Sequence, residues 1–575
     1  MQESLVSAIA AASALEPSQV SKVLVKPDNV GHGDFAFPCF ILAKEWKLAP
    51  PACAAKLKEA IALPPEFVRA EAVGPYLNFF LDRGAQTKEV ITNILGSGLK
   101  VGEKPKRDET ILVEYSSPNI AKHLHVGHLR TTLIGHSLAL ILKHLGYRVE
   151  SINHLGDWGV QFGFLYAACK IWGRPDNATV DSLLELYVKA SQLKKAQDDK
   201  AVSPSDGDKP DVGAMAREYF IRLEAKDPEA VEFWQWCLDI SLHEFRATYE
   251  RLNIYFDHYT GESFYSDHIP DVEAKIKKGG ILKESRGALG VDLGKELGFA
   301  RVFADDGRSL YITRDLAAAI YREKTFSPAK IVYVVAAQQT LHFRQLVAIL
   351  KLMNEPVAEK IVHVAFGFVP GMRTREGTAI TVHDFLEEAH ERALAAYREE
   401  VTKRPEGLDE DAIAEAVAIG ATYFYFLEHT NIKDFNFSWQ EALNFSGDSG
   451  AYAQYALARL YSIETKAREA GLDTTPEALQ NFDAALLAES EAYELVSLFS
   501  KFDATLEKAA RDFEPAHIAH YVLDLSRILA KTYKTLRVVG EEQALAKARL
   551  ALFMAARNVL HTALTLLGVP AIERM

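Results

Sequence analysis

The stretch from Leu112 to Gly163 constrains the fold most, because strand and helix signals alternate within it at short spacing. An apolar run ends at the sequence Ser-Ser-Pro-Asn, which stops a strand. Apolar residues then recur at helical spacing from Leu129, and Gly146 ends the helix. A second strand-like run, Tyr147–Ile152, follows. The order strand, turn, helix, strand predicts an α/β fold whose ligand site lies beyond the carboxyl ends of the strands.

The turn before this helix has residues suited to binding an anion. It reads His125-Val126-Gly127-His128. The first turn of a helix has unpaired backbone N–H groups and positive partial charge, so phosphate binds there readily. Gly127 places no Cβ in the path of a phosphate, and both histidines can donate hydrogen bonds. Taken alone, the pattern is more typical of histidines at a helix end, or of metal ligands that include His123.

Two longer strings resemble arginyl-tRNA synthetases, which are class I aminoacyl-tRNA synthetases. These strings are SPNIAKHLHVGHLR, residues 117–130, and HLGDWGVQFG, residues 154–163. Weaker likeness extends over essentially the whole chain, from HGDFAFPCFILAKEWK near the start to LLGVPAIERM at the end. The resemblance implies a Rossmann-like catalytic domain with a parallel sheet, an N-terminal α+β add-on domain and a C-terminal all-α anticodon-binding domain.

The predicted domains follow from the resemblance and from shifts in composition. They are residues 1–100, an α+β domain that contacts tRNA; residues 110–442, the catalytic domain with insertions at about 165–300; and residues 443–575, the helical anticodon-binding domain. The charged, Gly- and Pro-containing stretch Gly98–Glu109 reads as a linker. In the first domain, Gln19–Val25 reads as strand. The aromatic residues between Phe233 and Phe245 read as core packing.

Composition limits the classes of protein. The chain of 575 residues has 48% apolar and 25% charged residues, and no apolar run reaches the roughly 20 residues of a membrane span. Its four cysteines form no Cys-x-x-Cys pair, which argues against zinc and disulfides and suits the cytoplasm. The net charge of −13 means that any nucleic acid must bind to local basic faces.

The resemblance implies roles for the residues around the histidine motif. His125, His128 and Lys122 are the expected catalytic residues, and the expected ATP-binding residues are His125, Gly127, His128, Arg373 and Arg375. The two arginines lie where the class has its KMSKS loop, but neither lysine of that pattern is present here. Lys122 is therefore the candidate substitute cation. Without the family, a loop with two arginines is equally typical of a solvated turn.

The resemblance also places an arginine site. Its expected residues are Glu114, Asn119, Tyr311, Asp315 and Gln339. A guanidinium has five donors in one plane, so carboxylates bind it as a fork. We expect Asp315 to bind the guanidinium, Tyr311 to cover its flat face, and Gln339 to bind its remaining donors. Glu114, with Asn119 alongside, would bind the α-ammonium or the neighbouring amide network. Residues 311 and 315 share a face if this segment is helical. Asp315 is equally typical of a helix cap.

Candidate tRNA-binding residues lie in the last domain. By resemblance they are Tyr452, Gln454, Tyr455 and Arg459. From helical spacing, a basic stripe is formed by Arg527, Lys531, Lys534 and Arg537. Tyr521 and Tyr533 are interleaved with the stripe, which favours RNA contact. A charge stripe on a helix is otherwise typical of a solvated face.

These expectations combine into one activity. The resemblance implies ATP-dependent ligation of L-arginine to tRNA(Arg) through arginyl-adenylate, with Mg²⁺ bound to ATP and no zinc. We expect a cytoplasmic monomer whose partners are tRNA(Arg), L-arginine and ATP, with no membrane. Two alternatives stay open at this point: a free-standing nucleotidyltransferase that acts on a small metabolite, and a synthetase-like RNA-binding module without activity.

Overall fold

The computed structural model describes residues 2–27, 32–199, 210–285, 288–303, 310–370, 380–400 and 407–575. The chain forms two compact units. The smaller unit comprises Met1–Val101, Leu460–Lys501 and Arg527–Val559, and the larger comprises Gly102–Arg459, Phe502–Ser526 and Leu560–Met575. Each unit gathers segments that are distant in the chain, so the predicted domain limits at residues 100, 110 and 442 stay predictions.

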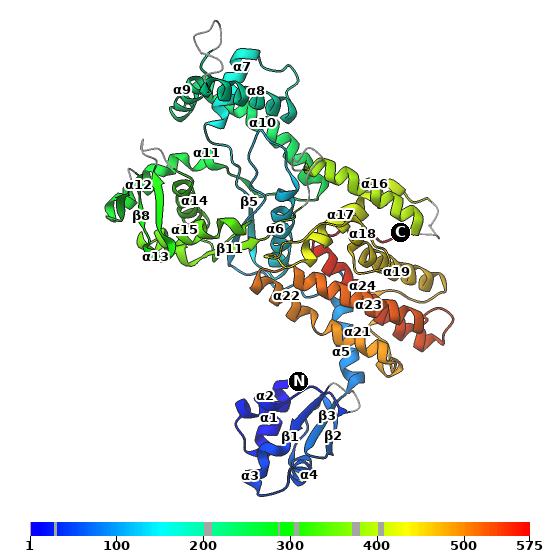
Figure 1. The fold of residues 1–575 in the computed structure, drawn as a ribbon. Coiled ribbons are helices and arrows are strands. Elements are labelled where there is room, and N and C mark those ends of the chain that lie inside the picture. The colour runs from blue at the N-terminus through cyan, green and yellow to red at the C-terminus, as the bar shows by residue number, and fades with distance from the viewer. Residues whose placement is uncertain are drawn as a thin grey trace. The chain divides into compact units, whose positions relative to one another are not determined.

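The first hundred residues of the smaller unit form a helical and antiparallel domain (Figure 1). Its three-stranded sheet has the order β1-β3-β2 and is antiparallel throughout. The elements are α1 (Gln2–Ser13), α2 (Pro17–Val23), β1 (Phe35–Pro38), α3 (Ala43–Trp46), α4 (Pro50–Ala60), β2 (Phe67–Val73), β3 (Tyr76–Leu81) and α5 (Arg83–Ser97). The prediction that Gln19–Val25 is strand is wrong. Pro17 at the helix start and the capping box between Glu16 and Gln19 favour helix there.

A five-stranded parallel sheet organises the larger unit (Figure 1). Its order is β11-β10-β4-β5-β6, and every neighbouring pair is parallel. The strands are β4 (Thr110–Glu114), β5 (Arg148–Asn153), β6 (His258–Tyr259), β10 (Lys330–Ala336) and β11 (Ile361–Phe366). All five residues of β4 are buried, as expected of a central strand covered on both faces.

Helices pack on this sheet and are joined to it by apolar side chains. Helix α6 (Val126–His144) follows β4, while α14 (Tyr311–Phe326) and α15 (Thr340–Leu352) flank β10 in the chain. Leu112 of β4 and Ile331 of β10 share one buried cluster with Leu316 of α14 and Leu346 of α15. The predicted α/β fold with a parallel sheet is confirmed.

Insertions separate β5, β6 and β10. The helices α7 (Gln161–Trp172), α8 (Val180–Asp198), α9 (Val212–Glu224) and α10 (Pro228–Arg251) lie between β5 and β6. The short helices α11 (Glu262–Tyr265), α12 (Ile269–Lys278) and α13 (Gly294–Leu297), with the antiparallel strands β7 (Leu282–Ser285), β8 (Ala288–Asp292) and β9 (Phe299–Phe303), precede α14. The sheet is therefore assembled from segments far apart in the sequence.

The described residues from 382 on form helices and loops, and the prediction of an all-helical pattern from residue 443 is confirmed. The helices are α16 (Val382–Glu400), α17 (Glu410–Glu428), α18 (Trp439–Ala442), α19 (Gly450–Glu469), α20 (Pro476–Leu479), α21 (Ser490–Phe499), α22 (Phe502–Asp512), α23 (Ala516–Thr535) and α24 (Gln543–Leu566). Across the part of the chain that is described, no helix combines the length and the apolar character needed to cross a bilayer.

Candidate active site

The two histidines of the signature motif form the start of α6. His125 is the N-cap residue, and its Nδ1 accepts a hydrogen bond from the Gly127 amide at 3.1 Å. The Nδ1 of His128 accepts one from the His125 amide at 3.2 Å. Because each Nδ1 accepts a backbone N–H, each neutral ring has its proton on Nε2. The two rings, with centroids 3.8 Å apart, therefore have Nε2–H groups as their remaining donors.

The surroundings keep both rings uncharged. Burial, with a smaller effect of His125, lowers the pKa of His128 to about 3. Burial and then the nearby Lys122 ammonium lower the pKa of His125. At neutral pH both imidazoles can therefore stabilise phosphate charge as hydrogen-bond donors and not as cations.

The backbone amides of the first turn already have partners. The Val126 amide donates to the Ile380 carbonyl at 3.1 Å, and the His128 amide donates to the His125 carbonyl at 2.7 Å. The Gly127 amide donates to the His125 ring. The expectation that these amides are open to phosphate is therefore wrong for this structure. Gly127 instead makes room for the ring, because a Cβ there would lie 2.8 Å from His125 Cε1.

Glu114 ends β4, where it is paired with a buried arginine. Arg322 Nη1 lies 2.5 Å from Glu114 Oε2, and the Arg322 side chain is fully buried. Arg322 Nε also donates to the Tyr265 hydroxyl at 3.2 Å. Sequence reasoning missed Arg322. A signal existed, since Arg322 follows Asp315 by two helical turns and so shares its face.

Asp315 lies in the second turn of α14 and accepts a hydrogen bond from His342. The distance from His342 Nε2 to Asp315 Oδ2 is 2.6 Å. Burial opposes ionisation of Asp315, but the hydrogen bond and the nearby cations outweigh burial and lower its pKa. The N-cap of α14 is Leu310, so the alternative reading of Asp315 as a cap is wrong. Asp315 is an ionised carboxylate at neutral pH.

A third carboxylate, Glu262, lies close to Asp315. Glu262 begins α11, and its Oε2 is 2.9 Å from Arg314 Nε, with both side chains largely buried. Burial raises the pKa of Glu262 to about 7; Asp315 and Asp157 add to this effect and Arg314 opposes it. Sequence reasoning missed Glu262. It could have been found as the acid that follows strand β6 at the ligand-binding edge.

Two more of the predicted arginine-site residues, Asn119 and Gln339, lie at the same sheet edge. Asn119 follows β4 and forms an isolated bridge with Gly156. Gln339 is exposed in the 3₁₀ turn that follows β10. Strands β4 and β10 are parallel neighbours, which places both residues at one edge. Tyr311 is 68% exposed, and the Arg314 guanidinium lies 4.9 Å from its ring centroid.

The predicted phosphate cations are only partly described. Lys122 is exposed, 6.0 Å from the ring centroid of Tyr187 in α8. Arg373 and Arg375 lie outside the described residues. Among the described residues, no three His, Cys, Asp or Glu side chains are grouped so as to hold a metal ion. Both ring nitrogens of His123 contact carboxylates instead.

The first group of candidate tRNA-binding residues lies on α19. Gln454 is fully buried, and its Nε2 donates to the Ala416 and Pro570 carbonyls at 2.9 Å. Its predicted RNA contact is therefore wrong, because packing of α19 uses the side chain. Tyr452 donates to the Ser526 carbonyl, and Arg459 lies 4.6 Å from the ring centroid of Tyr455.

The basic stripe of α23 is exposed along its length. Its members are Arg527, Lys531, Lys534 and Arg537, the last of which follows the end of the helix. Of the two interleaved tyrosines, Tyr533 is exposed. Tyr521 is buried against Phe502, so the expectation that it presents a ring to RNA is wrong.

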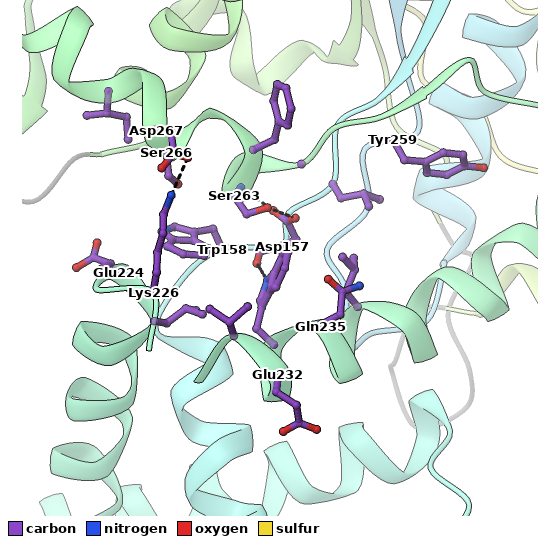
Figure 2. A pocket seen from close by; sticks show the side chains of 18 of the residues that line it. Asp157, Trp158, Glu224, Lys226, Glu232, Gln235, Tyr259, Ser263, Ser266 and Asp267 are labelled. Carbon is purple, nitrogen blue, oxygen red and sulfur yellow. Dashed lines mark hydrogen bonds and ion pairs between the residues drawn. The ribbon is translucent and has the colours of Figure 1, made fainter. Parts of the chain in front are cut away.

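A cavity of about 1250 Å³ lies between α10 and the segments 155–158 and 259–273. Figure 2 shows the side chains that line it. Trp158 and Trp234 line it, and Trp234 Nε1 donates to the Asp157 carbonyl at 2.7 Å. Asp157 accepts from the amide and the hydroxyl of Ser263. Phe233 and Phe245 are core residues as predicted, but Trp234 faces the cavity. None of the predicted site residues is among those that line it.

Comparison with known proteins accounts for nearly all of the chain. Residues 90–439 match the family described as tRNA synthetases class I (R), catalytic domain. Residues 1–81 match the arginyl tRNA synthetase N terminal domain, and residues 453–575 match the DALR anticodon binding domain. The arginine–tRNA ligase of Ligilactobacillus salivarius is 38% identical over 98% of this chain and 97% of its own length. The chain belongs to the arginyl-tRNA synthetase family.

Other arginyl-tRNA synthetases agree in sequence and in fold. The arginine–tRNA ligase of Streptococcus agalactiae is 39% identical over 98% of this chain and 97% of its own length. The solved arginyl-tRNA synthetase of Thermus thermophilus superposes with a TM-score of 0.72 at 26% identity, covering 100% of both chains. That of Plasmodium falciparum gives 0.75 at 23% identity, over 96% of this chain and 94% of its own, and supports the fold alone.

Proposed function

We propose that this chain joins L-arginine to tRNA(Arg) with ATP, through arginyl-adenylate, and releases AMP and pyrophosphate. The observation that carries the proposal is the pair of carboxylates Asp315 and Glu262, which interact electrostatically. Glu262 follows β6 and Asp315 is bonded to His342 after β10, while the histidine motif follows β4, so all three lie beyond the carboxyl ends of parallel strands. An acidic site next to a set of phosphate donors suits a cationic amino acid and a nucleotide. Membership of the arginyl-tRNA synthetase family supports the same reaction.

In this proposal the carboxylates select arginine. Asp315 and Glu262 would accept the planar N–H groups of the guanidinium, and Tyr311 would cover its face. Gln339 would accept a remaining N–H, and Asn119 would bind near the α-ammonium. Because Arg322 already neutralises Glu114, we assign Glu114 to orienting that network. Lysine lacks the planar fork and would leave acceptors unpaired, which accounts for discrimination without editing.

The nucleotide would lie against the start of α6. The Nε2–H groups of His125 and His128 would donate to phosphate oxygens, with Lys122 as the cation in the same loop. Arg373 and Arg375 lie outside the described residues and stay candidate cations by family resemblance. The arginine carboxylate attacks the α-phosphate in line, so the protein mainly positions the reactants and stabilises developing charge. Mg²⁺ enters with ATP as part of the substrate. The 2′-hydroxyl of the terminal adenosine of tRNA then accepts the arginyl group.

Replacing His128 by Ala is expected to lower the rate of arginine-dependent ATP–pyrophosphate exchange by roughly 10²-fold, because one preorganised donor is lost. Since burial holds the pKa of His128 near 3, the wild-type rate should show no titration of this ring between pH 5 and 8. The matched control is His363→Ala at a histidine outside the motif. A wild-type exchange rate in the His128 variant would contradict the assigned role.

The affinity for arginine should rise with pH because of Glu262. The raised pKa, about 7, means that Glu262 is protonated below that pH and ionised above it. If only the ionised form binds a guanidinium, the arginine KM should fall roughly tenfold between pH 6 and pH 8. Steady-state kinetics across this range measure the effect. Glu262→Gln should abolish the pH dependence, and its persistence in that variant would assign it to another group.

Cysteine burial supports the absence of structural zinc that we propose. All four cysteines are buried, and burial raises the pKa of the Cys169 thiol to about 11. Zinc requires the thiolate form.

We further propose a cytoplasmic monomer that contacts tRNA through the basic stripe on α23. Metal analysis tests the absence of zinc, and native mass measurement tests the monomeric state. Charging kinetics of Lys531→Glu test the contact of the stripe with tRNA.

The decisive experiment is to charge a total tRNA pool with each of the twenty amino acids in turn. We expect arginine alone to be attached. Pyrophosphate exchange that needs no amino acid would instead favour the nucleotidyltransferase. Binding of tRNA without exchange or charging would favour an inactive RNA-binding module.

A further inference from the structure

The loop between β4 and α6 has a strained backbone. Residues 115–125 connect Glu114 to the helix and include Lys122 and His125. Within the loop, Ser116, Ser117 and Ala121 have φ values of 69°, 48° and 58°. Side chains other than glycine disfavour this left-handed region, and it persists only where neighbouring groups hold it. The position of Lys122 and His125 thus depends on contacts from outside the loop.

Helix α10 of the insertion supplies such contacts. The Tyr249 hydroxyl lies 2.7 Å from Ser116 Oγ, and Ser241 Oγ accepts the Ala121 amide at 2.8 Å. These four residues are buried. Two of the three strained positions are therefore bonded to one helix that lies far from them in the sequence.

His123 adds an ionic link between the same loop and two insertion helices. His123 Nδ1 lies 2.8 Å from Glu244 Oε1 on α10, and Nε2 lies 2.9 Å from Asp181 Oδ1 on α8. Carboxylate oxygens accept hydrogen bonds, so both ring nitrogens carry protons and the ring is a cation. The side chain of Glu244 is 34% exposed and that of Asp181 is 78% exposed, so the bond to Glu244 is better shielded from water.

We infer that His123 is a positioning residue, which as a doubly bonded cation fixes the loop with Lys122 and His125 to α8 and α10. The inference rests on the proposed function, because its readout is arginine activation. His123 acts through the loop, since both of its ring nitrogens are bonded to the insertion. Loss of the link should release the loop and misplace Lys122 and His125 relative to ATP, which lowers the rate more than the affinity for arginine.

The link should also respond to alkaline pH. The groups that face His123 are Glu244 on α10 and Asp181 on α8, and its charged neighbour in the loop is Lys122. The hydrogen bond with Glu244 outweighs burial and raises the pKa of His123 to about 9. The cation is therefore complete below the ordinary value near 6.5 and is lost as pH rises through about 9.

The test compares His123→Ala, His123→Arg and wild type by pyrophosphate exchange with tRNA present. At pH 7.5, His123→Ala should lose about tenfold in kcat, while its arginine KM changes less than about threefold. His123→Arg should restore most of kcat, because a guanidinium can donate to both carboxylates. The ratio of wild-type to His123→Arg activity should be flat below pH 8 and fall above pH 9. Titration of the free arginine ammonium cancels in that ratio.

Matched variants separate the link from general damage. Glu244→Gln should lower kcat more than Asp181→Asn, and the double variant His123→Ala/Glu244→Gln should lose no more than His123→Ala alone. Wild-type kcat in His123→Ala, or a flat activity ratio through pH 10, would overturn the inference alone. Wild-type protein that fails to activate arginine would overturn the proposed function together with it. The pH dependence of the ratio of wild-type to His123→Arg activity tests the inference even if His123→Ala folds poorly.

Discussion

Replacing Asp315 by Asn is expected to lower kcat/KM for arginine by roughly 10²–10³-fold, equivalent to about 3–4 kcal/mol. The carboxylate is ionised and is held by His342, so it can form charge-assisted bonds to a guanidinium. An amide keeps the size of the side chain but presents one acceptor and no charge. Steady-state kinetics with arginine and ATP varied separately measure the change, and the KM for ATP should move less than about twofold.

The control for this variant is His342→Gln. It removes the imidazole that orients Asp315 but leaves the carboxylate, so we expect a loss of less than about tenfold. Equal shifts in the KM for arginine and for ATP after Asp315→Asn would show that Asp315 supports the whole site and not the guanidinium. Full activity in Asp315→Asn would indicate that Glu262, and not Asp315, selects arginine.

Replacing Arg322 by Met should produce the largest loss of stability, about 3–5 kcal/mol. Arg322 is fully buried and pairs with Glu114 at 2.5 Å, so its removal leaves an uncompensated carboxylate beneath the site. Burial by itself would lower the pKa of the Arg322 guanidinium. The oxygens of Tyr265 and Glu114 stabilise its positive charge and outweigh burial, so the pKa lies well above its ordinary value. A chain of several domains does not unfold in one step, so hydrogen exchange of the amides of β4 and β10 is the suitable measurement.

A double variant tests the cause of that loss. In Glu114→Gln/Arg322→Met no net charge stays buried, so protection of β4 and β10 should recover in part. If the two losses simply add, Arg322 stabilises the protein through its packing with Tyr265 and Tyr333 and not through its charge.

Local patterns predicted much of the catalytic core. The run before Ser116 is β4, the periodic segment after His125 is α6, and Tyr147–Ile152 overlaps β5. These elements are predictable because apolar spacing and glycine positions act within one segment. The placement of Tyr311 and Asp315 on one helix is likewise confirmed.

The errors about groups expected to bind a ligand have a common physical origin. Gln454 and Tyr521 have side chains suited to RNA, yet other helices bury them. The amides at the start of α6 look free in a single helix, yet the Ile380 carbonyl and the His125 ring occupy them. In each case a partner from elsewhere, or an unforeseen rotamer, satisfies the group. The sequence near such a group does not indicate which distant residue will contact it.

The sequence by itself determined the order strand, helix, strand around the histidine motif, the place of that motif at the start of a helix, and the family. Only the tertiary structure decided the ionic state of the site. Glu262 meets Arg314, Glu114 meets Arg322, and His123 meets Glu244 across long stretches of chain. The physical reason is that charge and pKa depend on burial and on neighbouring ions, and both are defined only when distant segments pack together.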